Sequence, residues 1–143
     1  MRQARSSGGA GGMNRVVLVV DDDAAFRELV SDLLVVDVGV DVAVATDGAD
    51  ALTQMRGLRP ALVLLDLRMP NIDGFEFCRR VQADPALAGT PVVVITAWGD
   101  AEEMRSKASE AGCAGFLAKP FGLEELLSVV SRWLPTDGPL KPP

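Results

Sequence analysis

The chain has 143 residues, enough for one domain with a substantial core but few for two. Hydrophobic residues make up 48% and charged residues 24%, proportions that exclude a disordered or fibrous chain. Fourteen Lys and Arg against twenty Asp and Glu leave a net charge of -6, and the basic residues form no cluster, so direct binding to nucleic acid is not expected.

The sequence has no histidine and two cysteines, which removes most metal, triad and general-base schemes. Cys78 and Cys113 fit no zinc or CxxC spacing, and we expect both to be buried core thiols in a reducing compartment. No apolar run is long enough to span a bilayer, and the segment after Arg5 is Ser and Gly rather than a signal core. We therefore expect a cytoplasmic protein without membrane insertion.

Composition along the chain predicts one folded domain between two tails. Residues 1–13 are rich in Gly and Ser and are expected to form a flexible N-terminal tail. Residues 135–143 form a Pro-rich C-terminal tail, which leaves 14–134 for the domain. The domain opens with an apolar strand over 16–20 (VVLVV), then three acids, then a helix whose apolar residues recur at helical spacing: Phe26, Leu29, Val30, Leu33 and Leu34.

Further strands follow, each with a plausible helix after it. Val40, Val42 and Val44 alternate with smaller or polar residues, whereas 62–65 (LVLL) and 92–95 (VVVI) are continuous apolar runs. A short fifth strand is predicted over 115–119 (GFLAK). The last helix has one apolar face, expected to pack on the core, made of Leu123, Leu126, Leu127, Val130 and Leu134.

Alternation of strands and helices predicts an α/β fold, a single doubly wound sheet of five parallel strands with helices on both faces. Continuous apolar runs are typical of strands that are buried on both faces. We therefore expect the first, third and fourth strands at the centre of the sheet and the second and fifth at its edges.

Polar residues whose side chains can bind ions or react lie where these strands end. Asp21 and Asp22 follow the first strand, Asp66 ends the third, Thr96 the fourth and Lys119 the fifth. Ligands of open parallel sheets bind beyond the carboxyl ends of the strands, so these five side chains are expected to share one site.

Three carboxylates that lie this close repel one another unless a cation joins them or one is protonated. Oxygen ligands without histidine or thiolate favour Mg²⁺ over zinc or copper. Lys119 would add a fixed positive charge and Thr96 a hydroxyl donor, groups that suit the oxygens of a phosphoryl group during transfer.

Four segments, VVDDD, LLDLRMPNIDG, VITA and GFLAKPF, stand in the order and spacing of receiver domains. Over about residues 14 to 134 the chain resembles this family, that of the chemotaxis response regulator. The resemblance implies a flavodoxin-like sheet with strand order 2-1-3-4-5 and five helices.

The resemblance also implies the roles of the acids. Asp66 would be the phosphoacceptor, taking a phosphoryl group from a phosphohistidine on a sensor histidine kinase or a histidine phosphotransfer protein. Asp22 and Asp66 would hold Mg²⁺ with the backbone carbonyl of Arg68, and Asp21 would act mainly through water. The domain would promote its own Mg²⁺-dependent phosphorylation and dephosphorylation without being an enzyme in the ordinary sense.

Five further positions acquire roles in the same way. Lys119 would pair with phosphoryl oxygens, Thr96 would move to hydrogen-bond the phosphoryl group, and Phe116 would swing into the vacated space. Phe116 stands where many members carry a tyrosine. Arg68 and Trp98 occupy the variable positions beside the phosphoryl group and are expected to lengthen its lifetime, or, for Trp98, to form a partner-binding surface instead.

Three local features have simpler interpretations. Asp23 is expected to cap the first helix, and Asp73-Gly74 to form a tight connection ahead of the third. The resemblance suggests a cis bond between Lys119 and Pro120.

The sequence thus favours a two-component phosphorelay protein, a single-domain response regulator that switches a protein-binding surface for a downstream protein. One alternative is a receiver fragment of a larger regulator. Another is an aspartyl-phosphate phosphatase or phosphotransferase, whose two acids would be Asp21 and Asp23. A third is a pseudo-receiver with the fold but without phosphorylation.

Overall fold

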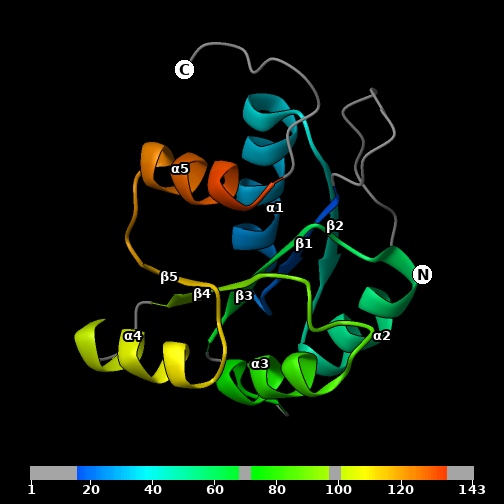
Figure 1. Ribbon diagram of the computed structural model, residues 1–143. Coiled ribbons are helices and arrows are strands. Elements are labelled where there is room, and N and C mark those ends of the chain that lie inside the picture. Colours follow the sequence, from blue (N-terminus) through cyan, green and yellow to red (C-terminus); the bar gives the residue numbers. More distant parts are fainter. Residues whose placement is uncertain (1–15, 68–71, 97–100, 135–143) are drawn as a thin grey trace.

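The computed structural model describes residues 16–67, 72–96 and 101–134 (Figure 1). Strands and helices alternate along the chain as β1 (Val16–Val20), α1 (Ala24–Leu33), a π-helical turn η1 (Leu34–Val38), β2 (Asp41–Ala45), α2 (Gly48–Leu58), β3 (Leu62–Asp66), α3 (Gly74–Ala83), β4 (Val92–Thr96), α4 (Ala101–Glu110), β5 (Gly115–Ala118) and α5 (Leu123–Trp133).

The five strands form one parallel sheet in the order β2-β1-β3-β4-β5, which confirms the predicted fold class and strand order. The strands with continuous apolar runs lie inside the sheet, and the alternating β2 and short β5 lie at its edges. Burial of both faces explains this placement, because only a strand covered on both sides gains from apolar residues at every position.

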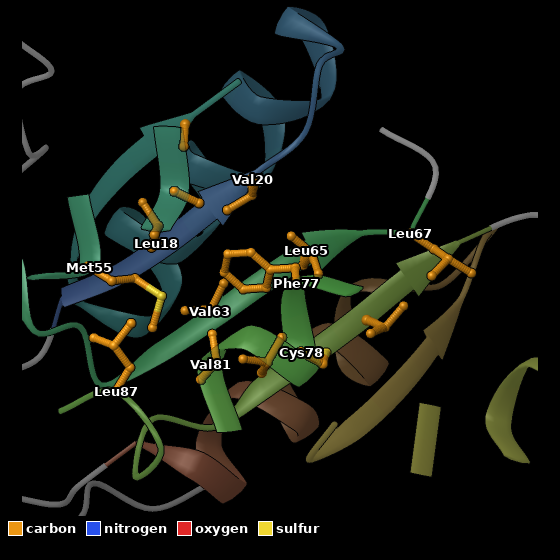
Figure 2. Close-up of a cluster of buried hydrophobic side chains, with 14 of the residues drawn as sticks. Leu18, Val20, Met55, Val63, Leu65, Leu67, Phe77, Cys78, Val81 and Leu87 are labelled. Atoms are coloured by element: carbon orange, nitrogen blue, oxygen red, sulfur yellow. The ribbon is translucent and has the colours of Figure 1, made fainter. Parts of the chain in front are cut away.

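Helices cover both faces of the sheet (Figure 1). Side chains of α1 and α5 form a core with Leu62 and Leu64 of β3, whereas α2, α3 and α4 form a second core with Val63 and Leu65. Phe77 of α3 lies within this second core, fully buried (Figure 2). Each large apolar side chain buried in this way contributes about 1.5–3 kcal/mol to stability, so the two cores fix the sheet between its helices.

Aspartates cap α1 and α3, of which the sequence predicted the first cap, whereas Asp73-Gly74 was expected only to form a tight connection. The Asp23 carboxylate accepts hydrogen bonds from the backbone N–H groups of Ala25 and Phe26 and so caps α1. Asp73 caps α3 by accepting from the N–H of Glu76 at 2.9 Å. Gly74 follows because a Cβ there would lie 2.9 Å from the Cα of Leu67, too close for any other residue without a shift.

The apolar helix faces are narrower than predicted. Leu123 is 43% exposed, so the expectation that it packs on the core with the rest of its face is wrong. Leu29, one of the apolar residues at helical spacing in the first helix, is 56% exposed. The first helix also continues beyond Leu33 as η1, which ends at Val38 and is capped by Gly39, a left-handed residue with φ of 80°. No periodicity in the sequence distinguishes this turn from an α-helix.

The cysteines differ from the prediction as well. Cys78 is buried, as expected, but Cys113 is only half-buried, and the two form a disulfide. The expectation of two free core thiols is therefore wrong, because sequence spacing carries no information on which side chains meet at a sequence separation of 35.

Two further predictions concern single features. The Lys119–Pro120 peptide bond is cis, as the resemblance suggested. Every helix in the described part of the chain is too short or too polar to traverse a bilayer.

Candidate functional site

Strand register brings the predicted site residues to one end of the sheet. β1, β3, β4 and β5 are consecutive neighbours, and their last residues are nearly level, with the Cα pairs Val20↔Leu65, Asp66↔Ile95 and Thr96↔Ala118. Asp21 and Lys119 each come one residue after a paired position. Parallel strands that end together therefore place acids, hydroxyl and lysine side by side.

Three carboxylates converge at this end. Oxygen atoms of Asp21, Asp22 and Asp66 all lie within 4.8 Å of one another. Among the described residues, the buried Oδ2 of Asp21 has no hydrogen-bond partner, although Nζ of Lys119 forms an ion pair with it at 3.6 Å. A buried carboxylate oxygen with no donor is costly unless a cation reaches it, and an all-oxygen donor set suits a hard divalent ion. These residues therefore fit Mg²⁺.

The two neighbouring acids Asp21 and Asp22 differ in environment. Asp21 is 1% exposed, whereas Asp22 is exposed. Burial raises the pKa of Asp21 to about 6, a hydrogen bond from the N–H of Asp23 opposes this rise, and the charge of Asp66 adds to it. The site thus contains one buried carboxyl group, that of Asp21, and one exposed carboxyl group, that of Asp22.

Lys119 supplies positive charge to the acids. Its Nζ lies 3.6 Å from Oδ2 of Asp21 and 4.0 Å from Oδ2 of Asp66. The same Nζ lies 4.0 Å from the centre of the Phe26 ring, which packs edge-on against Phe121. The ring face attracts the ammonium group and limits where it can go, so Lys119 is held beside the carboxylates.

Thr96 and Phe116 lie on neighbouring strands. Thr96 is 2% exposed at the end of β4, one residue beyond the level of Asp66. Phe116 of β5 is half-buried, and the guanidinium carbon of Arg105 in α4 lies 5.2 Å from its ring centre. The half-buried ring of Phe116 therefore connects β5 to α4 through its contact with Arg105.

Two site residues were not predicted from the sequence, and two predicted ones cannot be placed. Nη1 of Arg27 donates to the backbone carbonyl of Asp21 at 2.8 Å, and Phe26 contacts Lys119 as described. The spacing in the sequence could have predicted both contacts, because helical side chains point back toward the helix N-terminus and these two residues follow the acids by about one turn. Arg68 and Trp98 lie outside the described residues.

The arrangement suits phosphoryl chemistry at a carboxylate. Asp66 has an anionic oxygen beside a lysine, and the remaining acids offer ligands for a cation that would neutralise phosphoryl oxygens. Asp23, the second acid that the phosphatase alternative requires, is instead engaged as the cap of α1.

Comparison with known proteins identifies the family. Residues 17–131 match the model of the response regulator receiver domain, and the chain belongs to this family. It is therefore a receiver of two-component signalling, with the five-stranded fold described above.

Curated relatives and solved structures support the same family assignment. The DNA-binding response regulator MtrA of Mycolicibacterium paratuberculosis is 42% identical over 118 residues, which cover 82% of this chain and 50% of that protein. The chemotaxis response regulator CheY4 of Vibrio cholerae has a TM-score of 0.77 and 34% identity, covering 85% of this chain and all of that one. A response regulator from Chloroflexus aurantiacus gives a TM-score of 0.78 at 33% identity, covering 84% of this chain and 97% of that one. The chain thus spans about half the length of the DNA-binding regulators that it matches.

Proposed function

We propose that this receiver is a phosphorylation switch in which Asp66 accepts a phosphoryl group. Convergence of carboxylate oxygens of Asp21, Asp22 and Asp66 to within 4.8 Å of one another, beside Lys119, is the observation that carries the proposal. A carboxylate oxygen of Asp66 attacks the phosphorus of a phosphohistidine, the P–N bond breaks, and the imidazole of the donor leaves with the electron pair. The donor is a sensor histidine kinase or a histidine phosphotransfer protein in the cytoplasm.

Asp22 and Asp66 would hold Mg²⁺, with the carbonyl of Arg68 as a further ligand and Asp21 acting through water. The ion, when bound, neutralises charge on the phosphoryl oxygens. Lys119 pairs with the same oxygens, while Thr96 and Phe116 rearrange and so alter the surface of α4 and β5. A downstream protein reads this surface.

The experiment uses a small phosphodonor such as acetyl phosphate with Mg²⁺, followed by mass mapping of the modified residue. Modification of Asp66 is expected, with none in Asp66→Asn, because an amide oxygen is a poor nucleophile at phosphorus. Chelation of Mg²⁺ should suppress the reaction. Modification at another residue, or none with Mg²⁺ present, would contradict the proposal.

Lifetime of the phosphoryl group forms a finer part of the proposal, supported by the sequence and the family resemblance. Hydrolysis requires a water molecule in line with the phosphorus, and neither Arg68 nor Trp98 can accept a proton from it. Arg68 can also donate a forked hydrogen bond to phosphoryl oxygens. We expect phosphate loss slower than in the chemotaxis regulator, faster decay in Trp98→Glu and altered decay in Arg68→Asn. Unchanged decay in both variants would leave Trp98 as a partner-binding aromatic.

The effector of the switch has two candidates. A single-domain regulator acts on a separate protein, as the sequence suggested. A receiver unit within a longer DNA-binding regulator is favoured by the coverage of only 50% of MtrA and 48% of RpaA of Synechocystis. Antibody detection of the native gene product decides between them, because a product near 15.1 kDa supports the first and one about twice as large supports the second.

A further inference from the structure

Cys78 and Cys113 join two segments on one side of the sheet. Cys78 lies in α3 at 1% exposure beside the core side chains drawn in Figure 2, whereas Cys113 lies between α4 and β5 and is half-buried. Their Cα atoms are 5.8 Å apart, within the usual range for a disulfide. The bridge therefore ties the connection between α4 and β5 to α3.

The C-terminal end of α4 leads directly into Cys113. Gly112 is left-handed with φ of 90°, and its N–H donates to the carbonyl of Ser109 at 3.1 Å. The N–H of Cys113 donates to the carbonyl of Ala108 at 2.9 Å. This pair of hydrogen bonds closes the helix in a Schellman motif whose last residue is Cys113. A covalent bond at the sulfur of Cys113 thus anchors the end of α4 as well.

A cavity of about 290 Å³ opens beside Cys113 between α4, β5 and α5. Arg105 and Arg132, both exposed, contribute two positive charges to its lining, and none of the described residues that line it is acidic. Ser109 and Trp133 also line it. The cavity is large enough for a molecule of several heavy atoms, and its charge favours an anion.

We propose that the Cys78–Cys113 bridge is a thiol–disulfide exchange site, opened at Cys113 by a small anionic thiol that enters this cavity. The thiolate attacks the sulfur of Cys113, the bond between the two protein sulfurs breaks, and Cys78 leaves with the electron pair and takes up a proton. A second small thiolate attacks the outer sulfur of this mixed disulfide, the bond to the sulfur of Cys113 breaks, and Cys113 leaves with the electron pair and takes up a proton. The products are two protein thiols and one small disulfide, and the reverse reaction with that disulfide closes the bridge.

Access dictates the direction of attack. The sulfur of Cys78 lies in a buried residue, so the half-buried Cys113 is the accessible partner. Disulfides in reducing compartments are usually transient and regulatory, which agrees with a bridge that opens and closes. Opening releases the end of α4 from α3, next to Phe116, and so connects redox state to the surface that the proposed switch alters. The exchange itself does not require phosphorylation of Asp66.

The first test measures how fast the bridge opens with two probes, 2-mercaptoethanesulfonate and 2-mercaptoethanol, at equal thiolate concentration. Samples are quenched with acid, alkylated and mapped by mass. We expect the anionic probe to open the bridge about tenfold faster, with the mixed disulfide trapped on Cys113. Equal rates, or a mixed disulfide on Cys78, would overturn the proposal.

Charge-removing variants test the role of the cavity. Arg105→Gln with Arg132→Gln should bring the ratio of the two rates close to one. Arg56→Gln with Arg79→Gln is the matched control, because it also removes two positive charges, from α2 and α3, at residues that do not line this cavity. An unchanged ratio in the double variant, or an equal loss in the control, would contradict entry through this cavity.

The last test asks whether the bridge anchors α4. Hydrogen exchange of α4 should accelerate on reduction of the wild type, whereas the double variant Cys78→Ala/Cys113→Ser should show the fast rate with and without thiol. The bridge closes a loop between residues with a sequence separation of 35, so the oxidised protein should also melt about 10 °C higher than the reduced protein. Exchange in α4 that is the same with the bridge closed and open would overturn the regulatory part of the proposal, and failure of mild disulfide oxidants to form the bridge would overturn all of it.

Discussion

At the scale of single residues, the site depends on what lies one helical turn away from it. The aspartates at the end of β1 are held by the start of α1, where Arg27 binds the carbonyl of Asp21 and Phe26 lies against Lys119. The strand thus supplies the charges and the helix supplies their positions. Loss of the ring in Phe26→Ala would free the ammonium group without changing any charge.

Protonation of Asp21 provides a residue-scale prediction. In the metal-free protein its pKa is about 6, against 3.8 without the fold. The folded state therefore binds more protons than the unfolded state between these values, so this group stabilises the fold at low pH and that contribution is lost as pH rises through 6. Asp21→Asn lacks the titration.

Urea unfolding with a chelator at pH 5 and pH 8 measures the effect. We expect the free energy of unfolding of Asp21→Asn, relative to wild type, to be higher at pH 8 than at pH 5. A difference that does not vary with pH would contradict the raised pKa. Asp37→Asn, an exposed acid in η1, serves as the control.

At the scale of elements, strands were predicted better than helices. A strand buried on both faces is apolar at every position, so no choice of buried face is needed. The runs VVLVV and LVLL therefore identified β1 and β3 directly. A helical stripe gives the face but not its limits, and Leu29 and Leu123 lie at such limits. Both line a groove of about 470 Å³ between α1 and α5 instead of entering the core. The order of the strands in the sheet was predicted from the family resemblance, because apolar runs distinguish central strands from edge strands but do not give the order in which the strands pair.

Helix α4 is predicted to be the most mobile helix of the domain. Among the described residues of α4, Met104 is the one large apolar side chain that is buried, with Ala108 beside it, whereas α1 buries Val30 and also packs Phe26 and Leu33 against the core. Hydrogen exchange with the bridge reduced should show α4 opening at lower free energy than α1. Equal protection of the two helices would contradict this, and the same helix should change most on phosphorylation.

At the scale of the whole molecule, the candidate site was more predictable than the cysteine bridge. Parallel strands deliver their carboxyl ends to one edge whatever the loops do, so acids at strand ends were sufficient to predict that Asp21, Asp22 and Asp66 lie together. The contact of Cys78 with Cys113 depends on how α3 and the turn after α4 pack across the sheet, which no local pattern encodes.

Net charge also acts on the whole molecule and complicates any test of the metal. With 14 basic and 20 acidic residues, the fold experiences self-repulsion that any salt reduces. A rise in melting temperature with MgCl₂ alone would therefore not show a site. The comparison requires NaCl at matched ionic strength.

Under these conditions Mg²⁺ should still stabilise the protein, because binding to the folded state alone lowers its free energy by mass action. At about ten times the dissociation constant the gain is about 1.4 kcal/mol, or about 3–6 °C in melting temperature. Asp22→Ala removes an exposed ligand without disturbing the buried Asp21 and should abolish the gain, whereas Asp37→Ala changes net charge equally and should keep it. Equal responses of the two variants would show that Mg²⁺ acts only through general screening, and the three carboxylates would then not form a metal site.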